Sequence, residues 1–249
     1  MKIIGPDRLV FAGAGNPEVA KFLGDYGLTR AETTGVERYE AADGTSIDLV
    51  AEDDPAYPDT LGTGNRLRRI VYGVADAASL DAIAAELGKD QPIVRRADGS
   101  FDAVDPLGFA LAFQLTCRRA IAMPAESLNV PGAAPQRAVN TVALGDDFCP
   151  QPRSLSHFAL FVPDLAAAEA FYIGRLQFRL SDRLGEGPFL RPAGTHEHHT
   201  MFLIKTPPFL KGLEHLTFHF GGPTEVLRGG KHMLDLGYPQ FWGPGRHQM

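Results

Sequence analysis

One order of predicted elements occurs twice in this 249-residue chain, and this repetition constrains the fold most. Hydrophobic periodicity predicts strands at residues 8–11, 36–39, 47–51 and 69–74, and helices at 18–26 and 78–87. Asn16-Pro17 would start the first helix, and Gly27 would end it. The order returns with strands at 157–162, 189–191, 199–204 and 213–220, and helices at 166–172 and 224–236. An offset of about 146–149 residues superimposes the two copies.

A proline-rich segment separates the copies. Residues 123–153 contain Pro124, Pro131, Pro135, Pro150 and Pro152 and lack a sustained helical or strand period. We therefore expect an N-terminal module at 1–122, a connecting arm at 123–153 and a C-terminal module at 154–249.

The second copy ends earlier in its pattern than the first. The first helix–strand sequence closes with the turn Asp105-Pro106-Leu107-Gly108 and a strand at 109–113. The same offset places the counterpart at roughly residues 251–260, beyond Met249. We expect the second module to lack its last strand or two, as in an incomplete version of a longer chain.

All eight histidines lie between His157 and His247. Histidine is the commonest metal ligand and titrates nearest neutral pH, so this segregation predicts a reaction centre in the C-terminal module alone. A net charge of −6 argues against a nucleic-acid or anionic-membrane partner. Two cysteines, no leading apolar segment and short apolar runs favour a cytoplasmic protein, which we expect to form a homo-oligomer.

Strand alternation selects the candidate metal ligands. His215, Thr217 and His219 would share one face of their strand, with Glu214 on the other. His157 opens the first strand of the same module, so two imidazoles from distant positions could meet inside one curved sheet. A single histidine is more often a hydrogen-bonded core residue than a metal ligand. The occurrence of His157 and His215 in the same module, together with the alignment of the two copies, favours the metal-ligand interpretation.

The run HEHH at 196–199 is ambiguous. His196 and His198 fit a surface metal scavenger or a solvated turn equally well. His199 opens an apolar strand, and alternation predicts that it shares a face with Met201 and Leu203. A histidine at the start of an apolar face is a better candidate for a pocket.

Several motifs of the second copy resemble one enzyme family: SHFALFVPD at 156–164, FY at 171–172, FLR at 189–191, HHT at 198–200, GLEHL at 212–216 and WGPGRH at 242–247. Together they resemble two-module type I extradiol ring-cleavage dioxygenases of the vicinal oxygen chelate superfamily, also called the glyoxalase–bleomycin resistance–dioxygenase superfamily. The resemblance covers nearly the whole chain, and in the first module it is architectural.

The resemblance implies an α+β fold of tandem modules, each of two βαβββ units that form a curved, partly closed mixed sheet. It further implies extradiol (meta) cleavage of a catecholic substrate with O2 in aromatic catabolism, at Fe(II), alternatively Mn(II), held by two histidines and a carboxylate. By motif match, His157 and His215 would bind the metal and His199 would handle protons. His247 would contact substrate, and Phe189 would form an apolar wall.

The resemblance leaves one metal ligand without a match in this chain. In the family that the chain resembles, the carboxylate ligand is a glutamate that follows an Asp-Pro-x-Gly-like turn. That glutamate lies on the strand that the comparison of the two copies also indicates to be missing. Glu197, Glu225 and Asp235 do not match that motif position.

Two alternatives remain open. A metal-dependent glyoxalase-like isomerase or transferase would consume no oxygen with a catechol. A non-catalytic module that binds small aromatic ligands would not need the metal.

Overall fold

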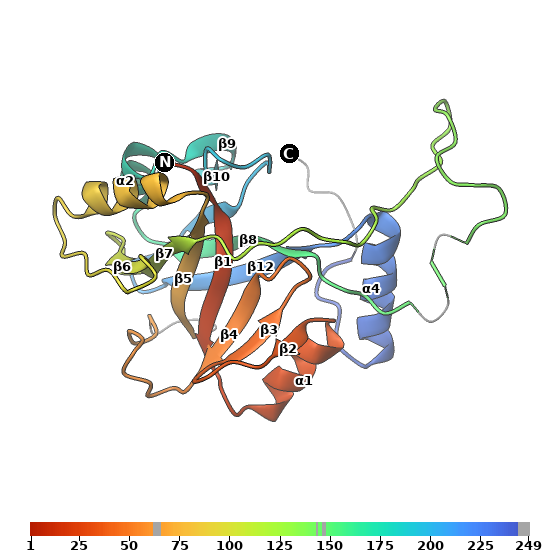
Figure 1. Cartoon of the computed structure of the whole chain (residues 1–249), viewed down its shortest axis with the longest axis horizontal. Coiled ribbons are helices and arrows are strands. Elements are labelled where there is room, and N and C mark those ends of the chain that lie inside the picture. The colour runs from red at the N-terminus through yellow and green to blue at the C-terminus, as the bar shows by residue number, and fades with distance from the viewer. Residues whose placement is uncertain (62–65, 143, 146–147, 244–249) are drawn as a thin grey trace.

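Two mixed β-sheets flanked by four α-helices form the described part of this α+β protein (Figure 1). The computed structural model describes residues 1–61, 66–142, 144–145 and 148–243. Among the described residues, no helix is both long and apolar enough to cross a bilayer.

The first sheet has seven strands in the order β2-β3-β4-β1-β5-β7-β6. Its elements are β1 (Ile3–Ala12), α1 (Pro17–Asp25), β2 (Thr29–Ala31), β3 (Glu37–Glu40), β4 (Ser46–Val50), β5 (Leu67–Val74), α2 (Ala77–Leu87), β6 (Phe101–Val104) and β7 (Ala110–Leu115). An isolated bridge between Arg95 and Phe101 precedes β6.

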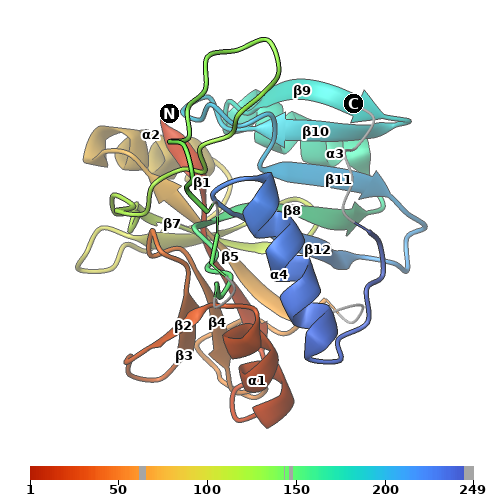
Figure 2. The same cartoon turned by 90° about the vertical axis from the view of Figure 1, so that its right-hand side faces the viewer.

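The second sheet has five strands in the order β12-β8-β11-β10-β9, which lie side by side in Figure 2. Its elements are β8 (Ser154–Val162), α3 (Leu165–Glu169) continued by the π-helix η1 (Ala170–Arg175), β9 (Arg179–Leu184), β10 (Gly187–Arg191), β11 (Met201–Lys205), β12 (Gly212–His219) and α4 (Pro223–Asp235).

The internal repeat predicted from the sequence is confirmed by strand pairing. β1 pairs in parallel with β4 and antiparallel with β5, and β8 pairs in the same senses with β11 and β12. Leu9 lies opposite Ile70 in the first sheet, as Phe158 lies opposite Leu216 in the second. β5 continues to β7, whereas among the described residues β12 pairs only with β8, so no described strand repeats β7 or β6. Neither described sheet closes into a barrel.

Local sequence signals account for the first helix. The Asn16 side chain accepts hydrogen bonds from the backbone N–H groups of Glu18 and Val19, Pro17 occupies the first turn, and Gly27 follows with φ +97°. The predicted start and stop are thus confirmed. β2 was not predicted, because its three residues are largely exposed and carry no apolar alternation.

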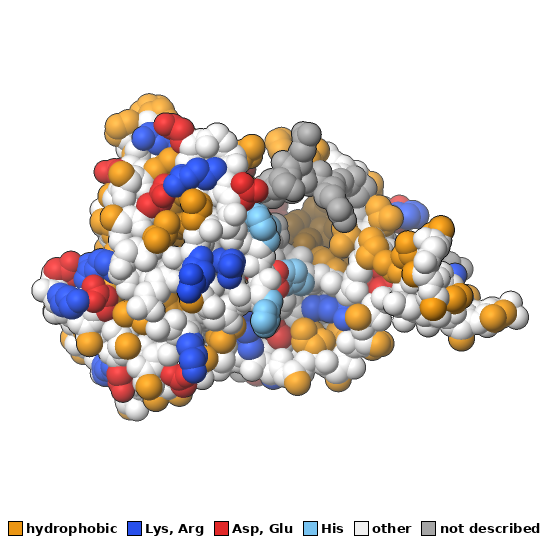
Figure 3. All heavy atoms as spheres, turned by 90° about the horizontal axis from the view of Figure 1, so that it is seen from above, with side chains coloured by type: hydrophobic (Ala, Val, Ile, Leu, Met, Phe, Trp, Pro, Cys, Tyr) orange, Lys and Arg blue, Asp and Glu red, His pale blue; other side chains and the backbone are white. Residues whose placement is uncertain are grey.

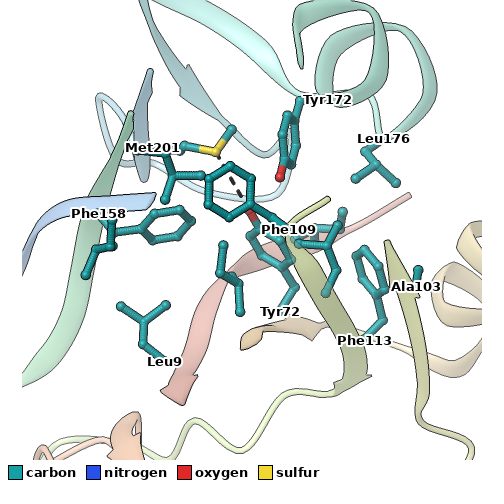
Figure 4. Close-up of a cluster of buried hydrophobic side chains, with 14 of the residues drawn as sticks. Leu9, Tyr72, Ala103, Phe109, Phe113, Phe158, Tyr172, Leu176 and Met201 are labelled. Carbon is teal, nitrogen blue, oxygen red and sulfur yellow. Dashed lines mark hydrogen bonds between the residues drawn. The ribbon is translucent and has the colours of Figure 1, made fainter. Parts of the chain in front are cut away.

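One hydrophobic core joins the two sheets. Tyr72 of β5 lies 5.9 Å from the ring of Phe178 and 6.5 Å from that of Phe158. Its hydroxyl reaches the Met201 sulfur at 3.9 Å (Figure 4). Because side chains from both copies interlock here, neither sheet buries its inner face alone.

A buried aspartate links the two copies within this core. Asp105 Oδ1 accepts hydrogen bonds from the backbone N–H groups of Leu107 and Phe109, at 2.9 and 2.8 Å. Its Oδ2 accepts one from the Tyr172 hydroxyl at 3.0 Å. Burial raises the pKa of Asp105 to about 6 despite these hydrogen bonds, which lower it.

Residues between β7 and β8 form no helix or strand where the structure describes them, and much of this segment extends away from the sheets (Figure 1). Arg153, near the end of this segment, holds the start of the segment beside α4. Its guanidinium donates to the carbonyls of Met123 and Pro124 and to the Glu225 carboxylate of α4. The division at residues 123 and 153 stays a prediction.

Candidate active site

One face of the second sheet gathers the candidate residues. His157 of β8 lies two residues before Ala159, which pairs with His215 of β12 and with Phe202 of β11. Phe202 pairs in turn with Phe189 of β10. Residues paired across strands share a face, so these four side chains occupy the face opposite the buried core. Histidines gather beside a hollow on the side of the molecule shown in Figure 3.

The structure brings His157 and His215 together. Their Nε2 atoms are 3.3 Å apart, and their rings cross at 82°. Imidazole nitrogens that share one metal ion at about 2.1 Å lie roughly 3–3.4 Å apart, so this spacing fits two ligands of one ion.

Both imidazoles have a partner at the other ring nitrogen. His157 Nδ1 lies 2.9 Å from the Thr217 hydroxyl, and His215 Nδ1 contacts the Glu214 carboxylate. Metal-binding histidines show this pattern, because an acceptor at Nδ1 fixes the tautomer and makes Nε2 a better donor to the ion. The two residues therefore fit a metal in chemistry as well as in distance.

Glu214 departs from the predicted alternation. It was expected on the face opposite His215, yet its carboxylate contacts that ring. The cause is a register shift between Leu213 and His215, which interrupts the regular pleat of β12. Glu214 contacts the ring nitrogen other than the one facing His157, so it is placed as a support for His215.

His199 lies beside the histidine pair. Its ring centroid is 4.4 Å from that of His157 and 4.7 Å from that of Phe189. The predicted face, shared with Met201 and Leu203, is wrong: those side chains are buried in the core. Strand β11 begins only at Met201, so the alternation does not extend back to His199.

Phe189 forms an aromatic wall of the site. It stacks on Phe202 with 4.1 Å between ring centroids and an interplanar angle of 9°, and it also makes an edge-to-face contact with the His199 ring. The pair gives this face a flat apolar surface next to polar imidazoles, a combination suited to an aromatic ligand.

Comparisons with known proteins agree with this architecture. The structure is similar to a Mn(II)-bound glyoxalase from Novosphingobium aromaticivorans, with a TM-score of 0.72 and 20% identity over 99% of this chain and 75% of that chain. It is also similar to 2,2',3-trihydroxybiphenyl 1,2-dioxygenase from Sphingomonas wittichii, with a TM-score of 0.67 and 22% identity over 99% and 83% of the two chains. Residues 154–247 match the model of the Glyoxalase/Bleomycin resistance protein/Dioxygenase superfamily.

The chain has a vicinal oxygen chelate fold. A further relative, Metapyrocatechase 2 from Cupriavidus necator, is 37% identical over 97 residues, which are 39% of this chain and 30% of that protein. The matched stretch thus spans less than a third of the curated relative. These matches confirm the resemblance that the sequence motifs indicated.

Within this vicinal oxygen chelate fold, a second polar pair was not predicted. His219 Nε2 lies 3.3 Å from the Glu197 carboxylate, and its Nδ1 lies 2.8 Å from the Ser154 hydroxyl. The hydrogen bond to His219 lowers the pKa of Glu197, so this carboxylate stays ionised. The sequence signal for this pair is the spacing of His219, which follows Thr217 by two residues and His215 by four and so shares their face of the strand.

Of three further histidines, His198 contacts the group, His232 lies apart from it, and His247 is outside the described residues. His232 approaches the backbone carbonyl of Asp25 at 3.1 Å, which is a packing role. His198 Nδ1 lies 3.0 Å from His199 Nδ1. His247, expected to contact substrate, is outside the described residues.

His157 and His215 are the two predicted metal ligands that the structure brings together. The described residues contain no group of three histidine, cysteine or acidic side chains that could hold one ion. The identity of a third ligand stays a prediction.

Proposed function

We propose that this chain forms the active centre of an extradiol dioxygenase, which cleaves a catecholic ring with O2. The observation that carries the proposal is the 3.3 Å approach of His157 and His215 Nε2, each imidazole supported at Nδ1. The dioxygenase relatives in the same fold supply the reaction class.

His157 and His215 would hold Fe(II), or alternatively Mn(II). When bound, the ion would supply positive charge that lowers the pKa of catechol hydroxyls, and open positions for substrate and O2. A carboxylate outside the described residues would complete the ligand set.

The remaining side chains would bind the ring and move protons. The stacked rings of Phe189 and Phe202 offer an apolar wall that excludes water from one side of a planar substrate. His199, whose ring lies near those of Phe189 and His157, would accept a hydroxyl proton from the substrate and return it during cleavage.

Metal binding and oxygen uptake test this proposal separately. Titration calorimetry with Fe(II) under anaerobic conditions should show affinity losses of more than about 100-fold for His157→Ala and His215→Ala, and of about 10–100-fold for Thr217→Val. The control is His196→Ala, which removes an exposed histidine three residues before His199 and should leave the Fe(II) affinity unchanged. Unchanged affinity in both ligand variants would overturn the metal site.

An oxygen electrode then tests the reaction. We expect catechol-dependent oxygen uptake in the iron-loaded chain, and its loss in His199→Ala with Fe(II) affinity retained. Iron binding without any catechol-dependent uptake would reject the dioxygenase assignment while leaving the metal site intact.

A glyoxalase-like isomerase is the second candidate, supported by the similarity to the Mn(II)-bound glyoxalase. It would use the same two histidines with no oxygen consumption. Isomerisation of a thiol–aldehyde adduct, together with no oxygen uptake, would favour it.

A further inference from the structure

The first sheet has a counterpart of the histidine face, built from different chemistry. Arg8 precedes Leu9 as His157 precedes Phe158 in the matching pair of strands. Arg69 precedes Ile70 as His215 precedes Leu216. The positions of both candidate metal ligands are therefore taken by arginines in the first copy.

The correspondence extends to the aromatic wall. Arg38 of β3 pairs with Asp48 of β4, as Phe189 pairs with Phe202 in the second copy. Four arginines (Arg8, Arg38, Arg69 and Arg96) line a cavity of about 220 Å³ on this face. We call this cavity the arginine cup.

The arginine cup holds more positive than negative charge. Arg38 forms a two-point ion pair with Asp48, at 2.9 and 2.7 Å. Arg69 and Arg96 share the single carboxylate of Asp102. Asp98 also lines the cavity, so four arginines face three aspartates, an excess of one positive charge in a chain whose net charge is −6.

Arg8 carries that uncompensated charge. No carboxylate among the described residues lies within 4.0 Å of its guanidinium. Its neighbour Cys117 is uncharged at neutral pH, because burial raises the pKa of this thiol to about 11.

Two buried donors in the arginine cup lack acceptors. The Nε atoms of Arg8 and Arg69 are shielded from solvent and have no hydrogen-bond partner in the described part of the chain. A buried donor without an acceptor is costly, so the chain itself leaves both guanidinium groups incompletely satisfied.

The floor of the cup is apolar. Val10, Val71 and Ala112 are buried here and pack with Tyr57. The Tyr57 ring lies 4.5 Å from the guanidinium carbon of Arg69, so the cavity offers an aromatic surface beside a cation. This combination favours an organic anion over inorganic phosphate, whose oxygens would lose hydration against the valines.

We propose that the arginine cup binds a small aromatic carboxylate, with the carboxylate between Arg8 and Arg69 and the ring against Val10, Val71 and Tyr57. The site is separate from the histidine face, since its lining comes from β1, β3, β4, β5 and β7 of the first sheet and from the loops that carry Tyr57, Arg96 and Asp98. Its test is therefore independent of the proposed dioxygenase activity.

Benzoate is the probe, and benzamide is its uncharged counterpart. In two-dimensional NMR titrations of methyl-labelled chain, benzoate should shift the Val10 and Val71 methyl resonances in a saturable manner. Benzamide and inorganic phosphate should bind at least tenfold more weakly. Equal affinity for benzoate and benzamide, or for benzoate and phosphate, would overturn the proposed ligand class.

Two variants of opposite sign test the charge. Arg8→Met should weaken benzoate binding at least tenfold, whereas Asp98→Asn, which removes a negative charge and keeps the turn to Ser100, should tighten it about two- to threefold. Arg66→Gln, an exposed arginine paired with Glu52, is the matched control. Unchanged affinity in Arg8→Met and Asp98→Asn would reject the site, and Asp98→Asn decides the matter if Arg8→Met fails to fold.

Discussion

Replacing Asp105 by asparagine should remove one pH-dependent part of the stability of this protein. The asparagine carbonyl can still accept from the N–H groups of Leu107 and Phe109, and its amide can donate to the Tyr172 oxygen. The substitution therefore keeps the shape and polar contacts of the site while abolishing its titration.

The magnitude follows from the pKa of Asp105. Burial raises it from 3.8 to about 6, so the folded state holds this proton more tightly than the unfolded state. The contribution is fully present below about pH 4 and is lost as the pH rises through about 6. The full loss is about 3 kcal/mol, of which about 2 kcal/mol falls between about pH 4.5 and pH 7.

Urea unfolding followed by circular dichroism measures this effect. The free energy of unfolding of Asp105→Asn minus that of the wild type should increase by about 2 kcal/mol between about pH 4.5 and pH 7. The subtraction cancels other groups that titrate alike in both proteins. Tyr172→Phe should steepen the pH dependence of the unfolding free energy. In the wild type the Tyr172 hydrogen bond lowers the pKa of Asp105, so its removal raises that pKa further.

A difference that stays constant over this pH range would refute the argument. It would mean that Asp105 ionises equally readily in both states, so the buried position imposes no cost on the carboxylate.

Two further predictions concern the packing around the connecting arm. Gly27→Ala should destabilise by more than about 2 kcal/mol, since its φ is +97° and a Cβ would collide with an arm carbonyl; Gly15→Ala, at φ +78° in open space, should cost about 1 kcal/mol in thermal unfolding. Glu225→Gln should cost about 3 kcal/mol in urea unfolding because it leaves Arg153 buried without its counter-charge, whereas Asp235→Asn on the same helix should cost much less. Equal effects within either pair would contradict the reasoning.

Much of the fold could be predicted because the repeat fixes strand order. Apolar alternation located most strands, and the same pairing order appears in both sheets. The prediction failed where no periodic signal exists: β2 is a short, largely exposed strand, and helix α3 continues into a π-helix at Ala170–Arg175 that was not predicted.

For the candidate site, the sequence determined which residues could meet. Period-two alternation predicted that His157 and His215 face the same concavity, and in the structure their Nε2 atoms are 3.3 Å apart. The role of these histidines as metal ligands stays a prediction for the binding experiments.

Only the tertiary structure decided the surroundings of those residues. The bulge that carries the Glu214 carboxylate to His215 and the irregular approach that turns His199 toward His157 both break strand periodicity. The arginine cup likewise combines side chains from strands and loops far apart in sequence. The sequence determines faces through local backbone geometry, whereas contacts between distant segments depend on how the sheets curve and pack, which no local pattern encodes.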